Sequence, residues 1–296
     1  MKSGLVAVVG RPNAGKSTLV NVLVGEKVSI VSSRPQTTRG LVRGVVTHAG
    51  PDREPDWQMI LIDTPGLHKP STELGRRLNQ AARASLSECD AALFVIDVTK
   101  VIGAGDQHIA SLLAEAGVVT IVTLAKLDLA GPELVAPQLS RAAAWGFTSY
   151  VPVSSVTGAG IDALIEETVA LLPEGPLYFP SEARSDQPEQ VLLAEIVREK
   201  FLDRLSDELP HSLAVRVTEW EERQDGLLWV AADLVVERPS QKGIIIGKGG
   251  GLIKLAGTEA RLDLEKLFGR RIHLDLHVRV EPDWQTRPQL LDRLGF

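Results

Sequence analysis

The chain lacks the usual marks of a secreted or membrane-spanning protein. Its 296 residues include a single cysteine, Cys89, so no disulfide can form within the chain and we expect a reducing compartment. No run of 18 apolar residues is present, which argues against a membrane-spanning helix. The N-terminus leads directly into a predicted strand, without the pattern of a signal peptide. These absences predict a cytoplasmic protein.

The chain also lacks an excess of positive charge. Its formal net charge of −6 argues against broad, nonspecific binding of nucleic acid, although it leaves room for a local basic patch. The hydrophobic content of 44% and the charged content of 24% are ordinary for a globular protein. A chain of this length favours two domains over one.

Residues 1–172 predict an α/β domain with a mostly parallel, doubly wound sheet, because short apolar runs alternate with helical patterns. The predicted strands are Leu5–Val9, Gln58–Asp63, Ala91–Val98, Val118–Leu124 and Tyr150–Val153, with the more polar Gly40–His48 at the edge. The predicted helices are Lys16–Val24, Gly75–Leu86, Asp106–Ala116, Glu133–Trp145 and Ile161–Leu171. Ligands are expected at the carboxyl ends of the strands.

Residues 173–189 contain several prolines among polar residues and predict a linker. Residues 190–296 then predict a smaller α+β domain, followed at its end by a C-terminal tail. The expected elements are a helix at Gln190–Leu205, strands at Ser212–Glu221 and Leu227–Glu237 joined around Asp225-Gly226, a helix at Leu252–Phe268 and a strand at Ile272–Val280.

The residues between the first predicted strand and helix match the P-loop pattern G-x-x-x-x-G-K-[ST] at every fixed position. Such a turn directs backbone N–H groups and the positive end of a helix toward one point, which suits a polyphosphate. We expect Lys16 to reach the β- and γ-phosphates and the Ser17 hydroxyl to bind Mg²⁺. The predicted nucleotide-binding residues here are Gly10, Arg11, Pro12, Asn13, Ala14, Gly15, Lys16, Ser17 and Thr18.

A second element, Asp63-Thr64-Pro65-Gly66, ends the strand that precedes it. The Asp63 carboxylate can hold Mg²⁺ through a water, and the Gly66 N–H can approach the γ-phosphate because no side chain obstructs it. We include Thr64, Pro65 and the following Leu67 among the nucleotide-binding residues.

With the polar segment Arg34–Arg39 between these elements, the arrangement resembles the TrmE–Era–EngA group of TRAFAC GTPases. The resemblance implies that a threonine of this segment binds Mg²⁺, with Thr38 as the better candidate and Thr37 as its rival. It implies that Asn13 helps to hold a K⁺ ion, and it makes Lys16, Thr38, Gly66 and Asn13 the catalytic residues. Many GTPases carry a glutamine where this chain has Leu67, so slow intrinsic hydrolysis is expected; His68 as a general base is an alternative.

Ala125-Lys126-Leu127-Asp128 stands where similar GTPases carry Asn-Lys-x-Asp. By that resemblance Asp128 selects guanine, Lys126 lies over the base, and the Ser154-Ser155-Val156 loop contacts the guanine oxygen. This chain departs from the pattern at Ala125, because the usual asparagine braces the P-loop. We expect its absence to weaken nucleotide affinity about tenfold, the scale of one hydrogen bond.

The segment Gly243–Gly250 contains G-x-x-G between two predicted helices, and the order of elements around it resembles a type II KH domain. In that family such a loop lets an RNA backbone approach two helix N-termini. The residues from 237 to 254 carry a net charge of +3, which favours single-stranded RNA. The predicted RNA-binding residues are Lys242, Ile246, Gly247, Lys248, Gly249, Gly250 and Lys254.

Nearly the whole chain, from residue 5 to about 294, resembles the Era family of GTPases. The resemblance implies a GTPase that binds GTP, GDP and Mg²⁺, acts in small-subunit (30S) ribosome assembly, and binds the 3′ region of 16S rRNA. It also implies peripheral association with the inner membrane, and we expect a monomer. Two other functions remain open: a nucleotide-gated RNA-binding module with negligible hydrolysis, and a P-loop ATPase or kinase.

Overall fold

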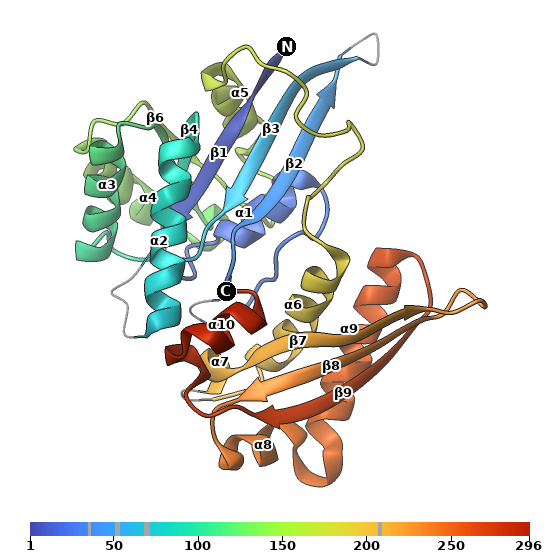
Figure 1. Cartoon of the computed structure of the whole chain (residues 1–296). Coiled ribbons are helices and arrows are strands. Elements are labelled where there is room, and N and C mark those ends of the chain that lie inside the picture. Colours follow the sequence, from blue (N-terminus) through green and yellow to red (C-terminus); the bar gives the residue numbers. More distant parts are fainter. Residues whose placement is uncertain (35–36, 51–53, 68–71, 207–208) are drawn as a thin grey trace. The chain divides into compact units, whose positions relative to one another are not determined.

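The computed structural model describes residues 1–296 except 35–36, 51–53, 68–71 and 207–208 (Figure 1). The chain divides into two compact units. The first ends at Asp186, and the second comprises Gln187–Phe296 together with Ile30–Thr37 and the beginning of helix α2 (Glu73–Glu88). Among the helices that the structure describes, none has the length and apolar character needed to cross a membrane.

The first unit is built on a six-stranded sheet with the order β2-β3-β1-β4-β5-β6. Only β2 is antiparallel to its neighbour, and it lies at the edge, so the predicted fold is confirmed. Its strands are β1 (Lys2–Gly10), β2 (Val42–Ala49), β3 (Pro55–Asp63), β4 (Ala91–Asp97), β5 (Val119–Ala125) and β6 (Ser149–Pro152).

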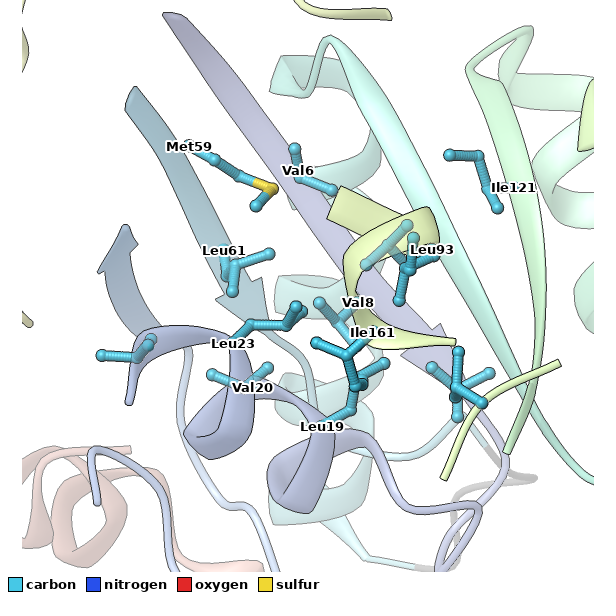
Figure 2. Close-up of a cluster of buried hydrophobic side chains, with 14 of the residues drawn as sticks. Val6, Val8, Leu19, Val20, Leu23, Met59, Leu61, Leu93, Ile121 and Ile161 are labelled. Atoms are coloured by element: carbon cyan, nitrogen blue, oxygen red, sulfur yellow. The ribbon is translucent and has the colours of Figure 1, made fainter. Parts of the chain in front are cut away.

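Helices cover both faces of this sheet, because successive apolar residues of a strand point to opposite sides. Val6 and Val8 of β1 pack with α1 (Lys16–Val24) and α5 (Ile161–Leu171), as Figure 2 shows for part of this cluster. The alternate residues Ala7 and Val9 pack on the other side. That side is covered by α2, α3 (Ala104–Ala116) and α4 (Pro132–Ala143).

Most of the predicted linker is attached to the sheet of the first unit. The buried side chain of Gln58 accepts hydrogen bonds from the backbone N–H groups of Tyr178 and Phe179 at 2.9 and 3.0 Å, and donates to the Phe179 carbonyl at 2.9 Å. Proline interrupts periodicity without preventing the neighbouring backbone from pairing, so the composition indicated no regular element but could not reveal this attachment. The predicted boundaries at 172 and 189 stay a prediction.

The second unit has a three-stranded sheet in the order β7-β8-β9, with β7 and β8 antiparallel and β8 and β9 parallel. Its helix–strand–strand–helix–helix–strand core confirms the predicted KH-type order. The elements are α6 (Glu189–Leu202), α7 (Leu209–Ser212), β7 (Ala214–Glu222), β8 (Leu228–Val236), α8 (Pro239–Ile246), α9 (Gly251–Phe268), β9 (Ile272–Val280) and α10 (Pro288–Leu294). Helices α6, α8 and α9 contribute to one apolar core with the sheet.

The C-terminal tail contributes to the core of the second unit. Trp284, just before α10, is fully buried, and its indole N–H donates to the Ser212 carbonyl at 2.9 Å. Its ring stacks on Phe296 with the centroids 5.7 Å apart. From the sequence these residues are expected to form a tail; in the structure they cover part of the core of the second unit.

The segment Ile30–Thr37 belongs to the second unit through polar contacts with α6 and the residues after it. The Asp203 carboxylate accepts from the Ser32 hydroxyl at 2.8 Å. The guanidinium of Arg198, which is fully buried, donates to the Thr37 carbonyl. Thr37, the residue before Thr38, is therefore held through its backbone carbonyl.

Candidate functional site

The P-loop has the backbone geometry of a phosphate cradle. Gly15 precedes α1 with φ +106°, and Asn13 is also left-handed, with φ +62°. A Cβ atom on Gly10 would lie 2.3 Å from the Val95 carbonyl oxygen, so only glycine fits at the end of β1. This turn brings the N-terminus of α1 to the carboxyl end of the sheet, where an anion is favoured.

Lys16 lies inside this loop. Its ammonium donates to the carbonyl oxygens of Gly10 and Arg11 at 3.2 and 3.0 Å, and only 6% of the residue is exposed. Burial lowers its pKa from the ordinary 10.5 to about 8, against the opposing effect of Asp63. A desolvated ammonium at the N-terminus of α1 suits the phosphates of a nucleotide.

The three predicted Mg²⁺ ligands converge. The Ser17 hydroxyl donates to Asp63 Oδ2 at 2.7 Å and lies 2.9 Å from the Thr38 hydroxyl, which is 3.4 Å from the same carboxylate oxygen. The Thr37 hydroxyl instead donates to the Arg34 carbonyl at 2.7 Å. Thr38, and not its rival Thr37, is thus grouped with Ser17 and Asp63.

The donor set fits a hard divalent cation. Asp63 is fully buried, and its Oδ1 atom has no hydrogen-bond partner in the part of the chain that the structure describes. Burial raises the pKa of this carboxyl, while Lys16 and hydrogen bonds from Ser17 and Thr38 act in the opposite direction. A buried, incompletely partnered carboxylate beside two hydroxyls is the oxygen-rich environment that Mg²⁺ requires.

The segment after β3 lies directly against the P-loop. A Cβ atom on Gly66 would be 2.7 Å from the Pro12 backbone nitrogen, so glycine is required for this close approach. The Thr64 hydroxyl donates to the Val8 carbonyl and fixes the segment to β1. Leu67 is only 7% exposed and joins the apolar cluster under α2 and α3, where it offers no polar group. Pro65 lies between Thr64 and Gly66, and His68 falls outside the described residues.

The two predicted base-binding loops are joined by a hydrogen bond. The Ser154 hydroxyl donates to Asp128 Oδ1 at 2.6 Å and accepts from the N–H of Val156 at 3.3 Å. Ser154 is buried, whereas Asp128 and Val156 are exposed, with Ser155 half-buried between them. The carboxylate is therefore held in a defined orientation at the surface, as recognition of a base edge requires.

The neighbouring Lys126 makes two contacts that were not predicted from the sequence. Its ammonium donates to the Asn13 carbonyl at 2.9 Å and to Asp97 Oδ2 at 2.7 Å. Ala125 is 2% exposed, and its Cβ lies 3.8 Å from the position that a Cβ on Gly15 would take. Asp97 was missed, although it is the last residue of a buried strand, as Asp63 is.

The remaining P-loop residues bind the loop to its surroundings. The Arg11 guanidinium donates to Asp106 at 3.3 Å, and that carboxylate also accepts from the Gly103 N–H at the start of α3. Ala14 is buried in the apolar core, and Thr18 lies in the first turn of α1. Arg11 and Ala14 thus support the loop structurally.

In the second unit, the predicted G-x-x-G loop joins α8 to α9. Gly247, Gly249 and Gly250 all have positive φ, at +74°, +59° and +79°. Around them Lys242, Lys248 and Lys254 are exposed, whereas Ile246 is half-buried and packs on the core. The structure therefore brings together the predicted basic residues and glycines, and gives Ile246 a packing contact.

Next to this loop lies a groove of about 270 Å³ between α9 and β9. A Cβ on Gly257 would lie 3.1 Å from Leu276 Cδ1, so glycine keeps the groove open. Apolar side chains and a cationic rim suit a stacked base beside a phosphate. Apart from Lys254, its lining residues were not predicted to bind RNA: Ile253, Gly257, Thr258, Arg261, Leu274 and Leu276. The sequence signal that could have indicated this groove is Gly257, a glycine inside a predicted helix.

Comparison with known protein families agrees with this division. A family model described as a 50S ribosome-binding GTPase matches residues 5–126, and a KH-domain model matches residues 208–285. The first range covers the P-loop, the Arg34–Arg39 segment and Asp63–Gly66, and ends before Asp128. The second covers the G-x-x-G loop with its groove.

Full-length relatives show the same combination. GTPase Era from Mycobacterium avium is 48% identical over 301 residues, with 100% of this chain and 99% of the relative covered. GTPase Era from Mycobacterium tuberculosis H37Rv is 46% identical, with coverages of 99% and 98%.

Two solved structures, each with a TM-score of 0.94 and covering 100% of this chain and 99% of the other, are also similar. One is an Aquifex aeolicus Era variant bound to GDP and AlF4⁻, at 37% identity. The other, at 38% identity, is Era with MgGDPNP and nucleotides 1506–1542 of 16S ribosomal RNA. On its identity to relatives of the same length, the chain belongs to the Era family of GTPases.

Proposed function

We propose that this chain hydrolyses GTP and binds single-stranded RNA at the 3′ end of 16S rRNA during assembly of the small ribosomal subunit. The observation that carries the proposal is the convergence of Ser17, Thr38 and Asp63 beside the P-loop. A G-x-x-G loop and a groove in the second unit support the RNA part. The solved Era complex with a 16S rRNA fragment indicates which RNA to test.

In this proposal, different residues of the first unit bind the phosphates, the base and the Mg²⁺ ion of the nucleotide. Lys16 and the backbone of the P-loop hold the phosphates, and Asp128 selects guanine by accepting hydrogen bonds from its edge. Ser17 and Thr38, with Asp63 through a water, would hold Mg²⁺, which when bound neutralises charge on the phosphates. The Gly66 N–H, which lies against the P-loop, would donate to the γ-phosphate.

Hydrolysis is expected to be slow without a further component. Leu67 is buried among apolar residues and cannot orient a water molecule. We infer that Asn13 helps to hold a K⁺ ion that adds positive charge near the phosphates. Turnover should then be faster in K⁺ than in Na⁺ at equal ionic strength, and equal rates would contradict this role.

For RNA, we propose that exposed Lys242, Lys248 and Lys254 contact phosphates while bases enter the groove beside α9. GTP binding would order Thr38, and the Thr37 carbonyl next to it accepts a hydrogen bond from Arg198 on α6. This contact supports a coupling of nucleotide and RNA binding, which must be reciprocal.

Single-turnover cleavage of GTP, with and without a single-stranded RNA of the 16S 3′ end, tests the proposal. We expect measurable cleavage that RNA changes, with excess ATP failing to compete. Absence of cleavage under both conditions would favour a nucleotide-gated RNA-binding module, and competition by ATP would favour an ATPase or kinase. Crosslinking to cellular RNA should enrich 16S rRNA; enrichment of tRNA or mRNA would overturn the ribosomal role.

We also infer that the protein is a cytoplasmic monomer that associates peripherally with the membrane. The family resemblance supports the membrane association, and this inference uses no structural feature of the chain itself. Flotation with vesicles containing 30% anionic lipid, and light scattering on a sizing column, test the two statements. Recovery only in the bottom fraction would exclude the membrane part, and a dimer mass would exclude the monomer.

A further inference from the structure

The first unit contains a buried serine, Ser29, that no motif of the sequence singles out. The residue is 2% exposed, and its hydroxyl has no hydrogen-bond partner in the part of the chain that the structure describes. Oδ1 of the buried Asp63 is in the same condition. A buried hydroxyl or carboxylate oxygen without a partner costs free energy, so both oxygens require an explanation.

Ser29 lies close to the Asp63 carboxylate. Burial raises the pKa of this carboxyl, whereas Lys16, Ser17 and Ser29 lower it. The geometry of α1 accounts for this position. Asn21 follows Ser17 by four residues, so the two side chains lie on one face of the helix. Ser17 donates to Asp63, and Asn21 binds the backbone of Ser29. The helix therefore brings Ser29 to the residues that are predicted to hold Mg²⁺.

Asn21 holds the segment after α1 through three hydrogen bonds. Its side-chain oxygen accepts from the N–H groups of Val28 and Ser29, each at 2.9 Å. Its side-chain nitrogen donates to the Ser29 carbonyl at 2.7 Å. The amide side chain thus satisfies both backbone groups of Ser29 and leaves the hydroxyl as the polar group of this residue that is free to bind something else.

We propose that Ser29 is a positioning residue of the Mg²⁺ site, whose hydroxyl acts with Asp63 Oδ1 to hold the water through which this carboxylate binds the ion. A buried water makes about three hydrogen bonds, and a hydroxyl can donate to it or accept from it. Asn21 in turn positions Ser29. We base this on the proposed binding of Mg²⁺ together with a guanine nucleotide.

The test is the dissociation rate of fluorescent GDPNP from the full chain, measured in EDTA and at rising concentrations of Mg²⁺. In the natural chain Mg²⁺ should slow dissociation, and we compare the Mg²⁺ concentration that gives half of this effect. Ser29→Ala should raise that concentration about fivefold, the scale of one hydrogen bond. Its rate in EDTA should stay within about twofold of the natural rate, because the hydroxyl acts through the ion and not on the nucleotide.

Asn21→Ala should give a similar rise, because it releases the backbone of Ser29. Adding Ser29→Ala to Asn21→Ala should then raise the Mg²⁺ concentration further by less than about twofold, since both changes remove the same contribution. Ser3→Ala is the matched control. Ser3 lies fully buried on β1, and its hydroxyl also lacks a partner among the described residues. This change should leave the Mg²⁺ dependence unaltered.

Should Ser29→Ala not fold, Ser29→Cys replaces the hydroxyl with a weakly hydrogen-bonding thiol, and the same rise is expected. An unchanged Mg²⁺ concentration would overturn the inference, as would an equal acceleration of dissociation in EDTA and in Mg²⁺, which indicates a structural role only. Rises that multiply in the double variant would overturn the role of Asn21. If Mg²⁺ does not slow dissociation from the natural chain, the proposed Mg²⁺ site fails instead.

Discussion

Two glycines of the loop between α8 and α9 should respond differently to the same added methyl group. Gly247 and Gly249 both have positive φ, at +74° and +59°. A Cβ on Gly247 would lie 2.7 Å from Leu252 Cβ and 2.8 Å from its backbone nitrogen. In the described part of the chain no atom lies within 4 Å of a Cβ on Gly249. The methyl group of alanine at 247 therefore clashes with the protein itself, whereas that of alanine at 249 would clash only with an approaching ligand.

The magnitudes follow from these contacts. A left-handed backbone costs an alanine about 1 kcal/mol at either position. The clash with Leu252 adds about 1–3 kcal/mol for Gly247→Ala, because a backbone atom cannot move aside as a side chain can. In a domain of this size 1 kcal/mol lowers Tm by about 4–8 °C, so we expect a loss of about 10 °C or more for Gly247→Ala. Gly249→Ala should lose only about 4–8 °C.

Calorimetry of the full chain measures Tm, and fluorescence anisotropy with a single-stranded RNA of the 16S 3′ end at one salt concentration measures RNA affinity. Gly249→Ala should bind this RNA at least about tenfold more weakly, because its methyl group stands where the RNA backbone approaches. Gly226→Ala is the matched control. That residue has φ +76° in the hairpin turn, and no described atom lies within 4 Å of its Cβ position.

Gly226→Ala should match Gly249→Ala in Tm and bind RNA as the natural chain does. The reasoning is refuted if Gly247→Ala and Gly249→Ala lose the same stability. It is also refuted if Gly249→Ala retains full RNA affinity.

Three further predictions concern other parts of the molecule. Gly66→Ala would place its Cβ 2.7 Å from the Pro12 nitrogen, and should lower single-turnover GTP cleavage at least about tenfold; an unchanged rate would contradict the close approach. Because burial lowers the pKa of Lys16 to about 8, the unfolded chain binds more protons than the folded one between pH 8 and 10.5, and stability gains with pH there. Lys16→Met should thus raise Tm of the nucleotide-free protein most below pH 8 and least above pH 10.5; a constant difference in melting scans would refute this. Trp284→Ala removes a fully buried ring and should destabilise the second unit by about 3–5 kcal/mol in urea unfolding, whereas a loss below about 1 kcal/mol would mean that the tail is not part of the core.

Much of the first unit could be predicted because its signals are local. The apolar runs of β1, β3 and β4 and the glycines of the P-loop act within a few residues of one another, so their spacing predicts both the elements and the turn. The same holds for the order of elements in the second unit and for the G-x-x-G loop. In each case the residues that act together are close in the sequence, so the covalent chain limits the distance between them.

The contacts that were missed join residues far apart in the chain. Gln58 holds a segment 120 residues away, and the groove beside α9 is completed by Leu276 from β9. Nothing in the sequence around Gln58 or Leu276 indicates which residues these side chains contact. The alternation of a strand predicts which face a side chain takes, but not what lies against that face.

The sequence by itself determined the phosphate-binding turn and the order of elements in both units, because local geometry and residue chemistry suffice for a phosphate turn and for the period of each element. That the first unit is a GTPase and the second a KH-type domain came from the resemblance of these motifs to known families. Only the tertiary structure decided that Thr38 rather than Thr37 joins Ser17 and Asp63. It likewise decided that Lys126 and Asp97 contact each other beside Ala125. Adjacent strands bring these residues within 3 Å of one another, and no spacing along a single strand encodes which strands are adjacent.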